Sequence, residues 1–202
     1  MRKISTLLLS LLLLSIGWLS LHAQKNTTLL FDFETESSGW QAGTPPNFGD
    51  SSAKAVKLST KNASQGKQAL ELIFEKSDLP KAVFFVEAPS DLSTESHLLF
   101  DLYGSDATSG VALALSTGSS WEWHESGVVP VKPGKQTIAF DLTASTYQSQ
   151  ASQWELTTSI KNLASTQRIA LVVFPDKAGS IFIDNIRLTS AVASDVSTAG
   201  QA

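Results

Sequence analysis

The chain of 202 residues has no cysteine, a single methionine and no basic cluster. Without cysteine it can form no disulfide and can carry no lipid on a thiol. Its formal net charge of −4 argues against nucleic acids and strongly anionic polysaccharides as partners. The sequence also has no P-loop, no dinucleotide-binding fingerprint and no zinc-type spacing of cysteine and histidine. The fold must therefore be stabilised by its hydrophobic core, without disulfides or a zinc centre.

The first residues have the composition of an export signal. Arg2 and Lys3 give a positively charged start, residues 7–14 form a leucine-rich run, and small residues near Ala23 allow cleavage before Gln24. The apolar part is shorter than the about 20 residues that a membrane-spanning helix needs. We expect residues 1–23 to be a cleaved signal peptide, with an uncleaved anchor as the alternative. The mature protein is then secreted or periplasmic and not bound to a membrane.

From residue 29 onward, short apolar runs alternate with turn residues, and no stretch has convincing helical periodicity. Three runs place apolar side chains on one face: Leu70, Leu72 and Phe74; Leu98, Phe100 and Leu102; Ile138, Phe140 and Leu142. Short strands at spacings of roughly 8–12 residues are typical of an all-β sandwich or barrel. We predict one domain over residues 24–190 and a disordered tail, rich in Ala, Ser, Thr and Gly, over residues 191–202.

Acidic side chains interrupt the first and the last predicted strands. Residues 29–34 carry Asp32 and Glu34, and residues 179–188 carry Asp184 within an apolar, β-branched run. If these strands pair, their acids could gather around one cation, because clustered carboxylates repel each other and hard oxygen ligands suit calcium. In the alternative, Glu34 pairs with a lysine and Asp184 accepts hydrogen bonds from turn amides.

Aromatic residues are the candidates for ligand binding. In an extended segment, Trp121 and Trp123 share one face, while Glu122 and His124 share the other. A flat aromatic ring suits the C–H face of a sugar, and carboxylates and amides suit its hydroxyl groups. Either the tryptophan pair forms a platform beside a polar rim, or it packs inward as core. If the segment bulges, one tryptophan points inward and the other outward.

The other aromatic residues have less distinctive surroundings. Trp40 follows a glycine at the end of the first strand, where a core position is favoured. Trp154 and Tyr147 lie in a polar stretch, in which they either wall a cleft or anchor a loop. Tyr103 continues the outward parity of its strand, so it is a candidate for a site on the face of a sheet.

A catalytic role has little support in the sequence. His124 lies beside Glu122 and Glu125, and paired carboxylates or a histidine base can serve glycoside hydrolysis or a lyase reaction. Nothing in the sequence fixes the separation of these groups, however, and neighbouring charges in a loop are usually solvated. A lyase for uronates would also need basic residues, and only Arg168 and Arg187 follow the export signal as arginines. We therefore expect a protein that is not an enzyme.

Several weak signals occur in a defined order along the chain: Phe31–Glu34 with Gly39-Trp40, Ser64–Leu70, Leu99–Tyr103, Gly134–Leu142 and Ile183–Ile186. Together they resemble the galactose-binding-like β-jelly-roll, the fold of many carbohydrate-binding modules of bacterial polysaccharide-degrading enzymes. The resemblance covers residues 29–188 and implies a sandwich of two antiparallel sheets. It also implies a structural calcium, held by Glu34, by backbone carbonyls around Lys67 and by Asp184, with Asp32 as an additional ligand.

Three functions stand as hypotheses. The first is a non-catalytic module that binds a neutral polysaccharide or oligosaccharide, alone or with a catalytic domain or partner enzyme. Its candidate site residues are Trp121, Trp123, Glu122, His124, Trp154 and Tyr103. The second is a structural or protein-interaction β-sandwich, in which all tryptophans are buried. The third is an enzyme on the same scaffold, which requires Glu122, His124 or Glu125 to converge with other polar groups in a pocket.

Overall fold

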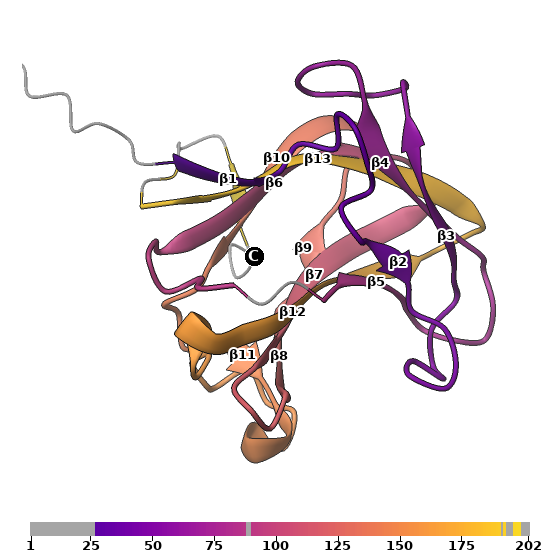
Figure 1. Cartoon of the computed structure of the whole chain (residues 1–202). Coiled ribbons are helices and arrows are strands. Elements are labelled where there is room, and N and C mark those ends of the chain that lie inside the picture. The colour runs from indigo at the N-terminus through magenta and orange to yellow at the C-terminus, as the bar shows by residue number, and fades with distance from the viewer. Residues whose placement is uncertain (1–26, 88–89, 191, 193–195, 199–202) are drawn as a thin grey trace, which may run out of the picture.

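The computed structural model describes residues 27–87, 90–190, 192 and 196–198 (Figure 1). The predicted signal peptide, residues 1–23, lies outside this range. Nearly all regular structure within the range is β-strand, and two 3₁₀ turns, η1 (Gln150–Ser152) and η2 (Leu163–Ser165), interrupt it. No helix in the described part of the chain has the length and apolar composition needed to cross a membrane.

Two sheets face each other, as predicted (Figure 1). Sheet A has the order β14-β10-β6-β13-β4-β3, with β1 also paired to β13, and sheet B has the order β11-β8-β7-β12-β5-β2, with β9 also paired to β7. The strands of sheet A are β1 (Thr27–Phe31), β3 (Ala53–Ser59), β4 (Ala69–Phe74), β6 (His97–Gly104), β10 (Gly134–Asp141), β13 (Gly179–Thr189) and β14 (Ser197–Thr198). Those of sheet B are β2 (Gln41–Ala42), β5 (Ala82–Val86), β7 (Thr108–Thr117), β8 (Glu122–Ser126), β9 (Val129–Pro130), β11 (Tyr147–Gln148) and β12 (Thr166–Pro175).

The pairing of strands is antiparallel apart from the short contact between β10 and β14, and the predicted sandwich of two antiparallel sheets is confirmed. Strand β14 lies inside the tail that we expected to be disordered. Ser197 and Thr198 pair in parallel with Ile138 and Ala139, so the expectation does not hold for these two residues. Much of the remaining tail lies outside the described residues.

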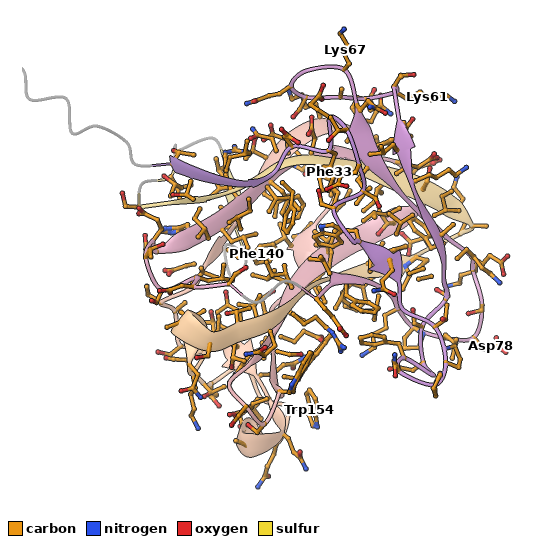
Figure 2. All side chains as sticks on the ribbon, viewed as in Figure 1. Phe33, Lys61, Lys67, Asp78, Phe140 and Trp154 are labelled. Carbon is orange, nitrogen blue, oxygen red and sulfur yellow. The ribbon has the colours of Figure 1, made fainter. Side chains whose placement is uncertain are left out.

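The main core lies between the sheets, because alternate residues of each strand point inward. Leu98, Phe100 and Leu102 of β6 and Leu113 of β7 are at most 2% exposed. Figure 2 shows Phe33 and Phe140 in this space. Trp40 is also buried, with its ring at an angle of 84° to that of Phe31, as its position after a glycine predicts.

A second, smaller apolar layer covers the outer face of sheet B. Small side chains of β7 and β12 leave room there for Phe48, which belongs to the loop after β2. The layer consists of Phe48, Val83, Phe85, Ala112, Ala114, Ala170 and Val172, with Trp123 and Phe174 packed at its border. Gly43 permits this arrangement, since a Cβ atom there would lie 2.8 Å from the Phe48 ring and 2.9 Å from a backbone oxygen of Val83. Sheet B is therefore apolar on both faces.

A polar network on the outer face of sheet A holds the turn between β3 and β4 against the strands. Asp101 of β6 and Asp184 of β13 are register partners and are at most 8% exposed. The Ser64 hydroxyl lies 2.8 Å from Asp101 Oδ2 and 3.0 Å from Asp184 Oδ2. Both terminal nitrogens of Arg187 donate to Asp101 Oδ1 at 3.2 Å. The guanidinium thus supplies the compensating charge that a buried carboxylate needs.

The network keeps Asp101 ionised. Burial alone would raise the pKa of this carboxyl group, but hydrogen bonds from Ser64, Asn185 and Thr137, together with the charge of Arg187, outweigh burial and lower the pKa. A pKa that is lower in the folded than in the unfolded chain stabilises the folded state above the ordinary pKa of about 4. This stabilisation is lost as the pH falls through the lowered value.

Replacing Asp101 by alanine should destabilise the protein, because Arg187 is then left partly buried without its carboxylate. We expect the free energy of unfolding at neutral pH to fall by about 3 kcal/mol, which lowers the melting temperature by about 6–12 °C. Thermal denaturation of Asp101→Ala and the wild type measures the difference.

Glu75→Ala is the matched control, since it removes an exposed ion pair with Lys54 (2.9 Å) and should change stability little. The difference in the free energy of unfolding between Asp101→Ala and the wild type should decrease as the pH falls below about 4. An Asp101→Ala protein as stable as the control at neutral pH would contradict this account of the network.

Candidate functional site

The outer face of sheet B carries a cluster of aromatic rings around one cation. Arg168 extends from β12, and its guanidinium carbon lies 4.7 Å from the ring centroid of Phe85, 5.1 Å from that of Trp121 and 5.3 Å from that of Phe48. Arg168 Nη2 also lies 2.6 Å from Glu87 Oε1. A planar guanidinium stacks well on ring faces, so Arg168 links three aromatic residues that come from different parts of the chain.

Trp123 and Glu125 continue this face along β8. Their side chains are two residues apart and therefore point to the same side of the strand. The indole Nε1 of Trp123 donates to Glu125 Oε2 at 3.1 Å, and Gln148 Nε2 donates to Glu125 Oε1 at the same distance. The Trp123 ring lies 6.0 Å from that of Phe48. Trp123 is therefore half-buried on the outer face, where it completes the second apolar layer.

Trp121 departs from the strand that follows it. Its backbone has a φ of 56°, in the left-handed region. Its N–H donates a hydrogen bond to the backbone oxygen of Gly118 across a turn. The turn leaves the indole 43% exposed while one ring face meets Arg168. Neither Trp121 nor Trp123 enters the space between the sheets, so the arrangement is nearest to the platform interpretation, with one exposed and one half-buried ring.

Trp154 belongs to a neighbouring loop after η1 and is 54% exposed. Figure 2 shows it beyond sheet B, on the side away from sheet A. A surface hollow lies between the two tryptophan-bearing segments and is lined by Ser120, Glu122, Gln150 and Ala151. Exposed indole rings and polar side chains thus occur together at this end of sheet B. Such a combination can bind a ligand with both apolar and hydrogen-bonding surfaces.

His124 does not reach this surface. It lies opposite Leu115 in the sheet register, points into the sandwich and has no exposed area. Neither ring nitrogen has a hydrogen-bond partner among the described residues, and Nε2 lies 3.9 Å from Glu122 Oε2. Burial lowers the pKa of the imidazole despite the nearby carboxylate. The expectation that His124 contacts a ligand beside the tryptophans is therefore wrong in geometry, because strand alternation places it on the opposite face.

Tyr103 is exposed, but on the other sheet. It lies on β6 of sheet A, where 41% of its surface is accessible. The outward parity predicted from the sequence places it on the outer face of that sheet, away from sheet B. Of the six predicted ligand-binding residues, the structure brings Trp121, Trp123 and Trp154 to one end of sheet B. Glu122 lines the hollow at that end, but it lies on the same face of β8 as His124. Tyr103 lies on the other sheet.

The predicted calcium ligands converge on the turn between β3 and β4. Glu34 accepts hydrogen bonds from the backbone N–H groups of Lys67 and Gln68 at 3.0–3.1 Å. Asp184 Oδ2 accepts from the N–H groups of Ser64 (2.8 Å) and Gln65 (3.0 Å). Gly66, with a φ of 58°, brings the turn against the Glu34 carboxyl group, where no side chain would fit.

For Asp184 these contacts match the alternative in which it accepts hydrogen bonds from turn amides. Glu34 also accepts from turn amides, where the alternative expected an ion pair with a lysine. The carboxylate oxygens face N–H and O–H donors, which a cation cannot replace without moving the turn. Among the described residues, the one donor to the Asp32 carboxylate is the N–H of Glu34, at 3.2 Å. The described residues contain no group of three or more His, Asp or Glu side chains suited to hold a metal ion. The donor set therefore does not fit calcium in this arrangement, and the calcium site stays a prediction from the resemblance.

A family model described as mannanase, galactose-binding domain-like, matches residues 31–167. The chain belongs to this family. The match includes Phe48, Phe85, Trp121, Trp123 and Trp154, and Arg168 follows its end directly. Most of β12 and all of β13 lie beyond the match. The match confirms the galactose-binding-like relationship that the order of sequence signals predicted.

Solved structures of the same fold include carbohydrate-binding modules. A family 11 module from Clostridium thermocellum, solved with a β-1,3-1,4-mixed-linked tetrasaccharide, is 17% identical with a TM-score of 0.60, and the match covers 82% of this chain and 96% of that one. A module specific for non-crystalline cellulose is 16% identical with a TM-score of 0.52, and the match covers 78% and 91%.

An exo-beta-agarase also contains this fold. It is 19% identical with a TM-score of 0.58, and the match covers 83% of this chain but only 25% of the agarase. The chain thus spans about a quarter of that enzyme's length. No curated protein matches the chain.

Sequence reasoning missed the residues at the centre of the galactose-binding-like domain's aromatic face. In the sequence, Arg168 stands out only as one of two arginines after the export signal. Phe48 and Phe85 show no pattern that assigns them to the outer face of a sheet. The one usable signal was the pair of small residues, Ala112 and Ala114, on the outer face of β7. Small side chains there leave room for larger ones from neighbouring segments.

Arg168→Lys should lower stability although it keeps the charge. A lysine ammonium is compact and hydrated and cannot stack on three rings as a guanidinium does. We expect a loss of about 1–2 kcal/mol in the free energy of unfolding, measured by chemical denaturation. Glu87→Gln removes the ion pair and leaves the stacking, so it should lower the free energy of unfolding by less than Arg168→Lys does. An equal loss in both variants would show that the ion pair, and not the stacking, holds Arg168.

Chelation distinguishes the two interpretations of the turn acids. The contacts described above need no metal and predict an unchanged melting temperature in excess EDTA. A calcium ion bound by Glu34 and Asp184 would instead stabilise the folded state by mass action, so EDTA would lower the melting temperature. Differential scanning calorimetry with EDTA, and then with added calcium, decides the question. A decrease reversed by calcium would establish the site.

Proposed function

We propose that this protein is a secreted, non-catalytic carbohydrate-binding module for a neutral polysaccharide, which it binds on the outer face of sheet B. The observation that carries the proposal is the exposed indole of Trp121, which is held against Arg168. Its chain neighbours Ser120 and Glu122 line a polar hollow. Stacking on Arg168 limits the motion of this ring, and a preorganised platform loses less entropy when a ligand binds. The exposed ring then offers an apolar surface to the C–H groups of a pyranose.

Polar groups near Trp121 can meet the sugar hydroxyls. Glu122 and Gln150 line the hollow and offer a carboxylate and an amide. Trp154, four residues after Gln150 in the chain, adds a second exposed ring at this end of sheet B.

A β-mannan is the first ligand to test. The family description names a mannanase, and a domain of such an enzyme encounters mannan. A β-1,3-1,4-mixed-linked glucan is the second, since the family 11 module of the same fold was solved with such a tetrasaccharide. The region matched in the agarase makes up 25% of that enzyme's chain, which supports a role beside a catalytic domain or partner enzyme.

The side chains considered for catalysis do not support an enzyme. His124 is buried between the sheets. The two carboxylate oxygens of Glu125 each accept one hydrogen bond, from Trp123 and from Gln148. Glu122 is thus the one candidate of the three that lines the surface hollow. A single carboxylate does not make the acid and base pair that glycoside hydrolysis uses.

A structural β-sandwich without glycan binding is the second candidate. The observation that favours it is the burial of Phe48, which fills the middle of the outer face of sheet B and is only 9% exposed. If the surface beside Phe48 serves only to cover the sheet, replacing Trp121 changes the stability of the protein and leaves its retention on glycans unchanged.

Trp121→Ala should reduce retention of the protein on insoluble β-mannan, because the exposed stacking surface is lost. We expect a decrease in affinity of tenfold or more, corresponding to about 1.4 kcal/mol. Depletion of protein from solution by mannan, mixed-linked glucan and agarose measures retention, and circular dichroism confirms folding. Trp123→Ala, in contrast, should also lower stability, since that ring packs on Phe48.

Leu29→Ala is the control, because it removes an apolar side chain that is 52% exposed on sheet A. Its retention should equal that of the wild type. Equal retention of folded Trp121→Ala and Leu29→Ala would overturn the proposed site. A wild-type protein retained on none of the glycans would favour the structural candidate.

A further inference from the structure

A second aromatic surface lies on the opposite side of the molecule. Tyr103 of β6 and Phe182 of β13 are register partners in neighbouring antiparallel strands. Each is two residues from a member of the outward-facing Asp101–Asp184 pair, so both rings lie on the outer face of sheet A. Tyr103 is 41% exposed and Phe182 is half-buried. The strands thus place two rings side by side without any loop to position them.

These rings border a hollow with polar walls. Asn62 contributes from the turn between β3 and β4, Ser105 and Asp106 from the turn after β6, and Lys177 from the turn before β13. The Ser105 hydroxyl donates to the backbone oxygen of Ser180 at 3.0 Å, which ties the turn after β6 to strand β13. The Asn62 amide and the Tyr103 hydroxyl have no hydrogen-bond partner among the described residues. Their donors and acceptors are free to bind a ligand.

The charges around the hollow favour a neutral ligand. Lys177 Nζ lies 2.6 Å from Asp106 Oδ2, and both side chains are more than half exposed. Because the two charges cancel, the hollow offers no net attraction to an anion or a metal ion. The pair still presents hydrogen-bond donors and acceptors to hydroxyl groups. Adjacent aromatic rings with amide, hydroxyl and paired charged groups at their border match the two kinds of surface of a pyranose ring.

We propose that this hollow is a second carbohydrate-binding site, which takes a pyranose unit of a neutral glycan. The choice of ligand class rests on the proposed function, whereas the site itself is separate from the tryptophan face. Since the two surfaces lie on the outer faces of opposite sheets, one protein molecule can hold two polysaccharide chains at once. On an insoluble glycan with many chains, the two sites together give tighter retention than either site alone.

Titration calorimetry of four proteins tests this proposal: the wild type, Tyr103→Ala, Trp121→Ala and the double variant. Each is titrated with β-1,4-mannohexaose and, separately, with a β-1,3-1,4-mixed-linked tetrasaccharide. We expect two oligosaccharides per wild-type molecule, one for each single variant and none for the double variant. Leu29→Ala, another exposed apolar side chain on sheet A, should bind two.

Tryptophan fluorescence gives an independent assignment of the sites. Trp121, Trp123 and Trp154 all lie at sheet B, and no tryptophan lines the hollow beside Tyr103. The fluorescence change on titration should therefore survive in Tyr103→Ala and be lost in Trp121→Ala. Light scattering of wild-type protein with soluble galactomannan should rise through cross-linking, and Tyr103→Ala should abolish that rise.

The outcomes separate the two proposals. A folded Tyr103→Ala protein with the wild-type stoichiometry overturns the second site and leaves the tryptophan site standing. If Tyr103→Ala binds nothing while Trp121→Ala binds as the wild type, the hollow is a carbohydrate site and the proposed site on sheet B is wrong. A wild-type protein that binds neither oligosaccharide overturns both.

Discussion

Two carboxylates, Asp101 and Asp184, face each other across neighbouring strands of sheet A, and the arrangement of that sheet depends on how they are neutralised. Arg187 supplies a positive charge, and Ser64 places a hydroxyl between the two oxygens. Because Ser64 and Gln65 also donate backbone N–H groups to Asp184, the network fixes a turn far away in the sequence. A buried carboxylate without such partners would lower the free energy of unfolding by several kcal/mol. The polar groups of the last long strand thus position the loop above it.

The two outer faces of the sandwich differ in polarity. On sheet A the outer face is polar near its centre, and the exposed Tyr103 and the half-buried Phe182 lie where the network ends. On sheet B the centre is apolar, and Phe48 covers it. Arg168 lies at the border of that layer, where its guanidinium meets three aromatic rings and Glu87 balances its charge. Exposed rings are therefore left at the borders of both faces, and these borders are where we place ligand binding.

Much of the fold could be predicted because strand periodicity is a local property. Leu98, Phe100 and Leu102 point inward as their alternation requires, and Tyr103 points outward. The pairing of the first strand with the last was also expected, and β1 does pair with β13. The stretch from residue 143 to 165 could not be assigned, since β11 and the two 3₁₀ turns are too short to produce a period.

The site was harder to predict because it depends on contacts between distant segments. Alternation correctly separates Trp123 from His124, but the sequence did not say which of the two faces the interior. The left-handed backbone of Trp121, which exposes its ring, has no signal in a non-glycine residue. Arg168 meets Phe48 only because a loop more than 100 residues earlier folds over small side chains. The acids Glu34 and Asp184 were placed at the correct turn, but the turn amides are their partners in the structure.

The central claim is that the exposed indole of Trp121 contacts a sugar chain. The most direct measurement follows the indole N–H signals in a ¹H–¹⁵N spectrum during titration with β-1,4-mannohexaose. Trp40 is an internal reference, because its ring is 5% exposed in the core and its Nε1 is buried. The account predicts that the Trp121 signal shifts in a saturable way while the Trp40 signal stays in place. A spectrum in which the Trp121 indole does not move while other signals titrate would contradict it.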